Sequence, residues 1–491
     1  MKDSTIEQIN QVMNEAHLAF LSYKNFPGKK KAEFLRSIAD EMELLGETLV
    51  KTAMRETNLP EARIINERGR TTGHCRMFAD LVEEASWAEV RIDTALPNRI
   101  PAPKPDIRKM LVSIGPVVVF GAANFPLAYS TAGGDTASAL AAGCPVIVKA
   151  HPAHPETSAL VASAIHKAME KTGMPKGVFQ HVFGNSFEVG QALVKHPLTK
   201  AVGFTGSLAG GKALFDIANQ RPEPIPVFAE MSSINPVILL PETLKKEAAS
   251  TAQKLAASIT LGVGQFCTNP GLIIAMEGEG LQQFINTLAE EIRRSLPGTM
   301  LHQGIADNYS AKLKRALEQK GVTVEAESAD AGSSAQGRPL VASAPAQEFI
   351  KNPALAEEVF GPFSLIIRCS DRDELCSVVN RLHGQLTTTI MGDESEVAQH
   401  SNLLNVIIEK AGRVILNGVP TGVEVCPAMM HGGPFPATTD SRFSAVGIDA
   451  IKRFARPVAF QNFSDALLPD ELKEGNPLGI WRLRDGVWGR N

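Results

Sequence analysis

Short apolar runs alternate with helix-like segments through the middle of the chain, and this alternation restricts the possible folds more than any other feature. Residues 117–120 (VVVF) and 145–148 (PVIV) are apolar runs, and a small-residue segment ending at Gly143 lies between them. Such a strand–helix–strand unit places its strands parallel in one sheet. The pattern continues with predicted helices at 156–172, 186–196 and 207–219 and predicted strands at 178–183, 201–205 and 225–230. We therefore expect an α/β fold with a mostly parallel sheet covered by helices.

The regions on either side of this alternation have other patterns. Residues 5–90 are predicted to form successive helices, because apolar positions recur at helical spacing. A strand near 235–241 leads into a long helix at about 243–262, so we expect a domain boundary near residue 235. Residues 324–348 are polar and small, which predicts an exposed excursion of the second domain. The segment after residue 456 lacks long periodic stretches and is expected to pack against another part of the protein.

The charge and the cysteines restrict the kind of partner. Lys plus Arg is 49 and Asp plus Glu is 53, so the net charge of −4 favours neither nucleic acid nor a membrane surface. The N-terminus lacks the pattern of a secretory signal, and the most apolar stretch, 111–128, is interrupted by Gly, Asn and Pro. The six cysteines have no metal-type spacing, which predicts reduced thiols in a cytoplasmic protein and no metal site. The expected partner is a small molecule.

Two residues have side chains suited to nucleophilic and acid–base chemistry. Cys267 follows the long predicted helix in a loop with glycines at 262 and 264, and such a loop can expose a thiol. An isolated cysteine is more often a small buried apolar residue. Glu230 ends an apolar strand, where it can either cap a neighbouring helix or accept a proton from a thiol or from water.

Two loops that follow predicted strands can bind anionic groups. Asn124 lies in the loop 121–126, and its amide can donate to an oxyanion. Residues 203–207 (GFTGS) form a strand–helix junction, and a helix start of this kind attracts phosphate. The region lacks the GxGxxG fingerprint, so any dinucleotide must be held differently from the standard Rossmann mode. Each signal alone is weak, because turn asparagines and strand–helix junctions are common.

Four segments, taken together and in order, resemble the aldehyde dehydrogenase superfamily. They are 124–127 (NFPL), 204–207 (FTGS), 264–268 (GQFCT) and 358–362 (EVFGP). The resemblance extends over nearly the whole chain. It implies an aldehyde dehydrogenase-like α/β fold, with a Rossmann-like cofactor domain, an α/β catalytic domain and a small β extension for oligomerisation.

The resemblance implies a catalytic role for three residues. Cys267 matches the nucleophile, Glu230 the general base, and Asn124 the side chain that completes an oxyanion hole with the Cys267 backbone N–H. Addition of the thiol to an aldehyde creates the alkoxide that expels hydride, and water then hydrolyses the thioester.

The resemblance also implies a nicotinamide cofactor. Many NAD-preferring members have a glutamate three residues after the lysine of the adenosine site, whereas here Pro152 occupies that position. Without a carboxylate to repel a 2′-phosphate, NADP is expected, with NAD as the alternative. Glu156 could restore a carboxylate through a loop rearrangement. The residues matched to cofactor binding are Lys149, Gly206, Ser207, Glu358 and Phe360.

Within the superfamily, residues 124–142, 151–158 and 229–236 are most similar to the 2-oxoglutarate semialdehyde (2,5-dioxopentanoate) dehydrogenases, and long-chain fatty aldehyde enzymes share some of these features. A buried arginine can pair with the carboxylate at the far end of such a substrate, whereas the hydrocarbon chain of a fatty aldehyde would leave the arginine charge unpaired. Arg70 falls where the substrate tunnel is expected and is the candidate for binding this carboxylate. Arg68 is the second candidate. Alternatively, Arg70 forms a surface ion pair with Glu67 or Glu61. The expected substrate-binding residues are Arg70, Phe125, Tyr129 and Phe443.

The resemblance finally implies domain ranges and an assembly. The NAD(P)-binding domain is expected at 1–94 and 113–235, the catalytic domain at 236–440, and the oligomerisation extension at 95–112 and 456–491. Exchange of this extension between subunits predicts a homodimer or homotetramer. There are two rival functions. The first is a CoA-acylating dehydrogenase, and Glu230 argues against it. The second is a binding protein that has lost catalysis, and the presence of all four residues Cys267, Glu230, Asn124 and Glu358 argues against it.

Overall fold

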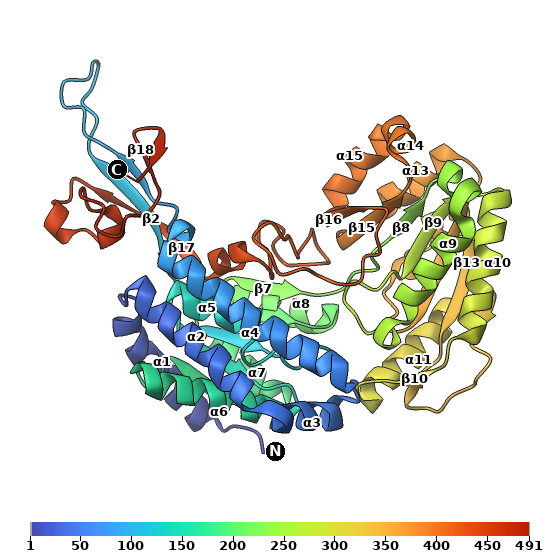
Figure 1. Cartoon of the computed structure of the whole chain (residues 1–491), viewed down its shortest axis with the longest axis horizontal. Coiled ribbons are helices and arrows are strands. Elements are labelled where there is room, and N and C mark those ends of the chain that lie inside the picture. The colour runs from blue at the N-terminus through green and yellow to red at the C-terminus, as the bar shows by residue number, and fades with distance from the viewer. Residues whose placement is uncertain (1, 491) are drawn as a thin grey trace.

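The computed structural model describes residues 2–490 and has three parts (Figure 1). A five-stranded parallel sheet covered by helices lies beside a seven-stranded sheet, and a third sheet projects from the first part. No helix within the described residues is long and apolar enough to cross a membrane.

Four helices precede the first sheet, as the periodicity of residues 5–90 predicts. The first begins with a capping box, in which Thr5 and Gln8 exchange side-chain-to-backbone hydrogen bonds. The Tyr23 hydroxyl at its end donates a 2.8 Å hydrogen bond to the Leu140 carbonyl and so attaches it to the sheet unit. The four helices are α1 (Ile6–Tyr23), α2 (Gly28–Leu44), α3 (Gly46–Thr57) and α4 (Glu61–Glu84).

The first sheet has the strand order β5-β4-β3-β6-β7 and is parallel throughout. Val117 and Val119 face a core formed with α2, α5 and α6, whereas Val118 faces a core formed with α1, α7 and α8. Successive residues of a strand point to opposite faces, which explains why its short runs are apolar throughout. The strands are β3 (Val117–Phe120), β4 (Val146–Lys149), β5 (Phe179–Val182), β6 (Ala201–Thr205) and β7 (Val227–Glu230). The helices are α5 (Gly134–Ala142), α6 (Pro155–Thr172), α7 (Phe187–Lys195) and α8 (Leu208–Asn219), and the predicted alternation is confirmed.

The second sheet has the order β11-β13-β14-β9-β8-β15-β16, and only β11 is antiparallel to its neighbour. Helices α9 and α10 cover one face, and α11, α12, α13 and α15 cover the other. The strands are β8 (Val237–Leu239), β9 (Leu272–Met276), β11 (Thr323–Glu327), β13 (Leu340–Pro345), β14 (Phe363–Cys369), β15 (Gln385–Met391) and β16 (Ala411–Leu416). The helices are α9 (Pro241–Thr260), α10 (Glu279–Arg294), α11 (Gln303–Leu317), α12 (Ala346–Lys351), α13 (Arg372–Arg381), α14 (Glu394–Gln399) and α15 (Ser401–Lys410). A small pair, β10 (Gly298–Thr299) and β12 (Gln336–Gly337), lies beside this sheet.

The prediction of an exposed excursion at 324–348 is wrong for its second half. Strand β13 lies between β11 and β14, and its first five residues are buried. The segment escaped recognition because Ala342, Ser343 and Ala344 are small, so the apolar signal is weak although the strand is internal. Only the loop at 329–334 is exposed throughout.

The third sheet projects from the body and combines residues from two distant parts of the chain. Its order is β17-β2-β1-β18-β19, in which β17 pairs antiparallel with β2 and β18 pairs parallel with β1. As expected, the segment after residue 456 packs against another part of the protein, and it shares a small apolar cluster with Ile92 and Met110. The sheet already begins at Arg91, before the predicted start of the extension at residue 95. The strands are β1 (Arg91–Asp93), β2 (Ile107–Ser113), β17 (Ala455–Gln461), β18 (Arg482–Arg484) and β19 (Val487–Gly489).

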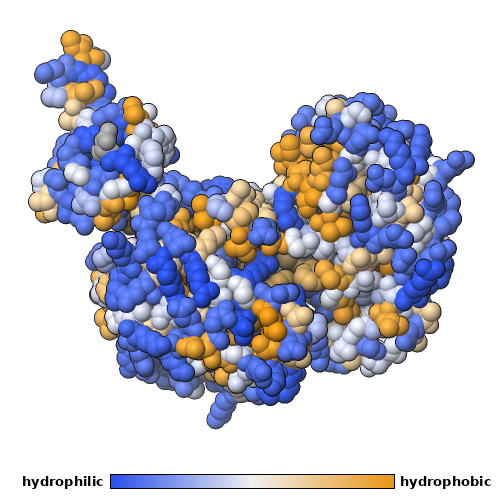
Figure 2. Space-filling view, in the orientation of Figure 1, coloured by the Kyte–Doolittle hydropathy of each residue, from blue (hydrophilic) through white to orange (hydrophobic). Residues whose placement is uncertain are grey.

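A hydrophobic patch lies over α15 and β16, across a hollow from the projecting sheet (Figure 2). Strand β16 is the last strand of the second sheet, so one of its edges has no neighbouring strand among the described residues. Ile408, Val414 and Leu416 are exposed there to 60%, 40% and 50%. An unpaired strand edge with apolar side chains is suited to contact with another chain.

Candidate active site

Cys267 lies in a tight loop between α9 and β9. The backbone turns through the short helix η2 (Leu261–Gly264), whose last three residues have positive φ angles of 55°, 59° and 63°. A Cβ added at Gly264 would lie 2.3 Å from the Gly361 carbonyl, so the close contact between these loops requires glycine. The Asn235 amide donates a 2.8 Å hydrogen bond to the Cys267 carbonyl. These contacts hold the half-buried thiol between the two sheets.

Three reactive side chains converge at this loop. His431 Nε2 lies 3.7 Å from Cys267 Sγ, and 3.1 and 3.0 Å from the two carboxylate oxygens of Glu230. Glu230 is the last residue of β7, while His431 lies in the loop that follows β16. The His431 backbone N–H donates to Ser444 Oγ at 3.0 Å, which orders this loop. A carboxylate and an imidazole therefore lie beside the predicted nucleophile.

The electrostatics of this group favour an ionised carboxylate beside a protonated thiol. Burial raises the pKa of the Cys267 thiol well above its ordinary value, and the neighbouring Glu230 raises it further. Burial also acts to raise the pKa of Glu230, but His431 and the contact with Cys267 outweigh it, so that this pKa is lowered. The resting site therefore has the protonation state that a general base needs.

Asn124 lies next to the Cys267 loop, as the predicted oxyanion hole requires. Its Nδ2 donates a 3.1 Å hydrogen bond to the Gln265 carbonyl, two residues before the thiol. An amide NH₂ group has two N–H donors, so one remains for an oxyanion. The Arg63 guanidinium donates to the Asn124 carbonyl at 3.4 Å and ties the loop to α4.

Aromatic and cationic side chains from α4 and the loop after β3 pack beside the thiol. The Phe125 ring contacts those of Tyr129 and Phe266 edge to face, at centroid distances of 5.1 and 5.8 Å. Arg70 donates a 3.1 Å hydrogen bond to the Tyr129 hydroxyl, and the Arg63 guanidinium lies 4.2 Å from the Phe125 ring centroid. Arg70 thus faces the aromatic cluster, and no ion pair with Glu67 or Glu61 is found among the described residues.

Two other expected substrate contacts do not lie in this cluster. The fallback Arg68 faces the other side of α4, where it pairs with Glu43 at 3.1 Å and donates to the Gly46 carbonyl at 3.3 Å. The Phe443 ring packs edge to face on Phe228 at a centroid distance of 5.2 Å. Arg68 therefore lies away from the aromatic cluster, and the Phe443 ring packs on Phe228 instead of Phe125.

The predicted adenosine and pyrophosphate residues lie at the carboxyl ends of the first sheet. Lys149 ends β4, and the adjoining pocket is lined by Ala150, His151, Pro152, Pro155, Phe183, Gly184 and Asn185. Burial lowers the pKa of Lys149, and no ion pair within 4.0 Å occupies it in the described part of the chain. Ser207 caps α8 by accepting from the Gly210 N–H at 3.1 Å, and Gly206 precedes it. The cationic lysine and the N-terminus of α8 fit an anionic dinucleotide.

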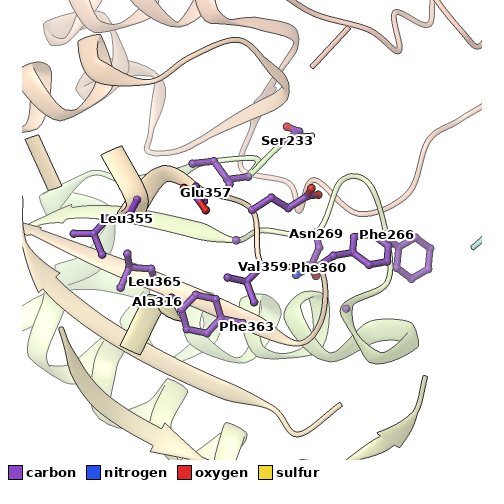
Figure 3. Close-up of a pocket in the computed structure, with 15 residues that line it drawn as sticks. Ser233, Phe266, Asn269, Ala316, Leu355, Glu357, Val359, Phe360, Phe363 and Leu365 are labelled. Carbon is purple, nitrogen blue, oxygen red and sulfur yellow. The ribbon is translucent and has the colours of Figure 1, made fainter. Parts of the chain in front are cut away.

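Glu358 and Phe360 line a second pocket behind the Cys267 loop. Figure 3 shows this pocket between the segment with Glu357, Val359 and Phe360 and the loop with Phe266 and Asn269. The Ser232 hydroxyl donates a 2.9 Å hydrogen bond to Glu358. Burial raises the pKa of Glu358 to about 7, although the hydrogen bond from Ser232 opposes the shift. An acceptor at this position fits the hydroxyls of a ribose.

Comparison with known proteins identifies the family. Residues 1–442 match the profile of the Aldehyde dehydrogenase family. An alpha-ketoglutaric semialdehyde dehydrogenase of Acinetobacter baylyi is 48% identical over 489 residues, which cover 99% of this chain and 93% of the relative. Alpha-ketoglutaric semialdehyde dehydrogenase 2 of Azospirillum brasilense is 52% identical over 468 residues, covering 95% and 89%. The chain belongs to the aldehyde dehydrogenase family.

Solved structures confirm the aldehyde dehydrogenase fold. Glyceraldehyde-3-phosphate dehydrogenase GapN from Methanocaldococcus jannaschii, complexed with NADP, matches with a TM-score of 0.79 at 20% identity, over 94% of this chain and 95% of that chain. A 1-pyrroline-5-carboxylate dehydrogenase matches with a TM-score of 0.78 at 19% identity, over 94% and 86%. The chain is thus an enzyme of a family that uses NAD or NADP.

Two residues of this aldehyde dehydrogenase site were missed from the sequence. Arg63 lies seven residues before Arg70 on α4, so the two share a helix face, and this spacing could have indicated it. His431 had no such signal, because its partner Glu230 lies 201 residues away and the loop after β16 has no periodic pattern. Only the tertiary structure brings this histidine to the thiol.

Proposed function

We propose that this aldehyde dehydrogenase oxidises 2-oxoglutarate semialdehyde to 2-oxoglutarate, with NADP as the cofactor. The observation that carries the substrate is the pair of partly buried guanidiniums, Arg63 and Arg70, that border the aromatic cluster beside Cys267. Planar guanidinium groups pair bidentately with carboxylates, and the substrate has a carboxylate at the end opposite its aldehyde. The names of the two relatives from Acinetobacter baylyi and Azospirillum brasilense support the same substrate.

The first half of the proposed reaction acylates Cys267. Glu230 takes the proton of the thiol as the sulfur attacks the aldehyde carbon. The Asn124 amide and the Cys267 backbone N–H donate to the oxyanion of the tetrahedral adduct. The nicotinamide cofactor supplies, when bound, the acceptor for the hydride that leaves this adduct. A thioester remains on Cys267.

The second half hydrolyses this thioester. Glu230 first releases the proton of the thiol to solvent and is again a carboxylate. It then takes a proton from water as the water oxygen attacks the thioester carbon, and collapse of this adduct releases the acid and the Cys267 sulfur, which takes the proton back from Glu230. His431 contacts both oxygens of Glu230, so we assign it as a positioning residue that aims the carboxylate at the sulfur and at the water. A base held in this position favours hydrolysis over transfer of the acyl group to CoA. The presence of a positioned base also argues against a binding protein that has lost catalysis.

The preference for NADP rests on the surroundings of Lys149. Pro152 offers no carboxylate toward a 2′-phosphate, and Glu156 is exposed and paired with Arg55 instead. Neither residue therefore offers a carboxylate that would compete with a 2′-phosphate for the amine of Lys149. Gly206 and Ser207 would lie below the pyrophosphate, and Glu358 and Phe360 beside the nicotinamide ribose and ring.

The proposed assembly is a homodimer or homotetramer. The sheet that contains β17 and β2 projects from the body, and the patch on α15 and β16 leaves apolar surface and a strand edge open. A projecting β sheet that pairs with a second chain would cover this apolar surface and this strand edge.

The proposed domain ranges are those expected from the sequence, except that the oligomerisation extension also includes β1. All six cysteines are free, which supports a cytoplasmic location.

The test is a comparison of substrates with the purified enzyme. NADPH or NADH formation is followed by absorbance, with 2-oxoglutarate semialdehyde and with a long-chain aldehyde such as decanal, first with NADP and then with NAD. We expect the carboxylated substrate to exceed decanal in kcat/KM by about tenfold or more, which corresponds to about 1.4 kcal/mol. A higher kcat/KM for decanal would reject 2-oxoglutarate semialdehyde as the substrate and identify the protein as a fatty aldehyde dehydrogenase. Formation of acyl-CoA in the presence of CoA would instead identify an acylating enzyme.

A further inference from the structure

Glu230, Cys267 and His431 form a group of potential metal ligands. One carboxylate oxygen, Sγ and Nε2 all lie within 4.8 Å of one another. Glu230 and His431 are buried, and Cys267 is half-buried. The three residues come from β7, the loop after α9 and the loop after β16, which is why sequence spacing indicated no metal site.

Two of the three separations of these atoms are within about 0.4 Å of those in tetrahedral zinc coordination. Zinc binds thiolate sulfur at about 2.3 Å, imidazole nitrogen at about 2.0–2.1 Å and carboxylate oxygen at about 2.0–2.2 Å. Tetrahedral angles then place sulfur about 3.6 Å from nitrogen, and nitrogen about 3.4 Å from oxygen. The structure has 3.7 Å between Sγ and Nε2, and 3.0–3.1 Å between Nε2 and the carboxylate oxygens. Small side-chain movements would therefore complete three of four coordination positions.

The charge of the group also favours a divalent cation. Binding would convert the Cys267 thiol into a thiolate and release its proton to solvent, so that one thiolate and one carboxylate balance the charge of Zn²⁺. Without a cation, two neighbouring anions in a largely buried site are unfavourable. A set of one sulfur, one imidazole and one carboxylate selects zinc over Mg²⁺ and Ca²⁺, which prefer oxygen ligands.

We propose that Glu230, Cys267 and His431 form an inhibitory site for Zn²⁺, in which the metal captures the nucleophile and the general base together. The fourth position remains open for water. The binding itself depends only on the geometry of the three side chains, whereas the inhibition rests on the proposed function. The two can therefore be measured and can fail separately.

Binding is tested with Co²⁺, which substitutes for Zn²⁺ and absorbs in the near ultraviolet when a thiolate is bound. The purified enzyme without cofactor is titrated with CoCl₂, and bound Co²⁺ is then displaced with ZnCl₂. We expect one equivalent with thiolate-to-cobalt absorption, and complete loss of this absorption in Cys267→Ser. The variants His431→Gln and Glu230→Gln should weaken binding by at least about tenfold.

Two control variants separate this site from other places where metal could bind. Cys376 is half-buried on α13, and Cys376→Ser should leave the absorption unchanged. His302 lies beside His151 and His154, with ring centroids of 6.4 Å for His302–His151 and 5.3 Å for His151–His154, so metal could bind at that cluster. Absorption that persists in Cys267→Ser, or that is lost only in His302→Gln, would overturn the proposal. So would equal affinity of wild type and His431→Gln, because the thiol would then bind metal without the histidine.

The inhibition is tested by turnover in the presence of Zn²⁺. We expect micromolar free Zn²⁺ to abolish NADPH formation and EDTA to restore it fully. Tight binding without inhibition would reject the inhibitory role but leave the metal site. Binding with the expected ligand dependence, in an enzyme inactive toward every aldehyde tried, would support the site and count against the proposed function alone.

Discussion

The Ser232 hydroxyl donates a 2.9 Å hydrogen bond to Oε2 of Glu358, across 126 residues of sequence. Ser232 lies two residues after Glu230, and Glu358 lines the pocket behind the Cys267 loop. The segment of the predicted base and the segment expected to hold the nicotinamide ribose are thus joined directly. Lys312 also donates to the backbone carbonyl of Glu358 at 3.0 Å, so the side chain and the backbone of this residue are each held by a hydrogen bond.

Glu358 is expected to destabilise the free enzyme at alkaline pH. Its folded-state pKa is raised from 4.5 to about 7 by burial, so the stability associated with the protonated form is complete below about pH 4.5 and is lost as the pH rises through 7. Glu358→Gln should therefore stabilise the cofactor-free protein by about 2 kcal/mol at pH 8, after allowance for partial exposure, and have little effect at pH 4.5.

Thermal unfolding of both proteins at these two pH values measures this effect. The matched control is Glu357→Gln, because Glu357 is exposed and pairs with Arg315 at 3.1 Å. A stabilisation that is equal at both pH values would show that ionisation of Glu358 is not its cause.

Arg70 is expected to determine the preference for a carboxylated substrate. Replacing it with methionine removes the charge while keeping a long side chain beside Tyr129. We expect kcat/KM for 2-oxoglutarate semialdehyde to fall by about 10- to 100-fold, the value of a charge-assisted hydrogen bond, while kcat/KM for a short neutral aldehyde changes little. Arg68→Met is the control, because Arg68 lies on the same helix and pairs with Glu43.

Steady-state kinetics with the two substrates measures the difference for both variants. Equal losses for charged and neutral aldehydes in Arg70→Met would mean that Arg70 supports Tyr129 rather than the substrate. Arg63→Met gives a second test, since its guanidinium stacks on Phe125.

The sequence predicts local features of this enzyme well and long-range contacts poorly. The alternation of β3 to β7 with α5 to α8 was predictable because each element has its own apolar periodicity. Strand β13 was missed because three of its residues are small, so its apolar signal is weak although helices on both faces of the sheet bury it. His431 was missed because its contacts with Cys267 and Glu230 span 164 and 201 residues. The family resemblance indicated the thiol and the carboxylate but not the histidine that touches both.

His431 is expected to act through Glu230 rather than through the substrate. In His431→Gln the carboxylate loses its fixed neighbour, so we expect kcat to fall by about 10- to 100-fold, part of the total contribution of a general base. The KM for the aldehyde should change by less than about threefold, because the aromatic and arginine contacts are intact. Steady-state kinetics separates the two constants, and a raised KM with unchanged kcat would contradict the positioning role. Circular dichroism of the variant checks that it is folded.

The strand edge of β16 is expected to be essential for assembly. Val414 is 40% exposed in the middle of this strand, within the patch shared with Ile408 and Leu416. A charge there would have to be desolvated in any contact between chains, so Val414→Glu should convert the proposed oligomer into a smaller species. Light scattering coupled to size-exclusion chromatography measures the mass, and Phe187→Glu, at an 86% exposed residue of α7, is the matched control. An unchanged mass for Val414→Glu, with Phe187→Glu also unchanged, would place the contact between chains elsewhere and leave the patch without a role in assembly.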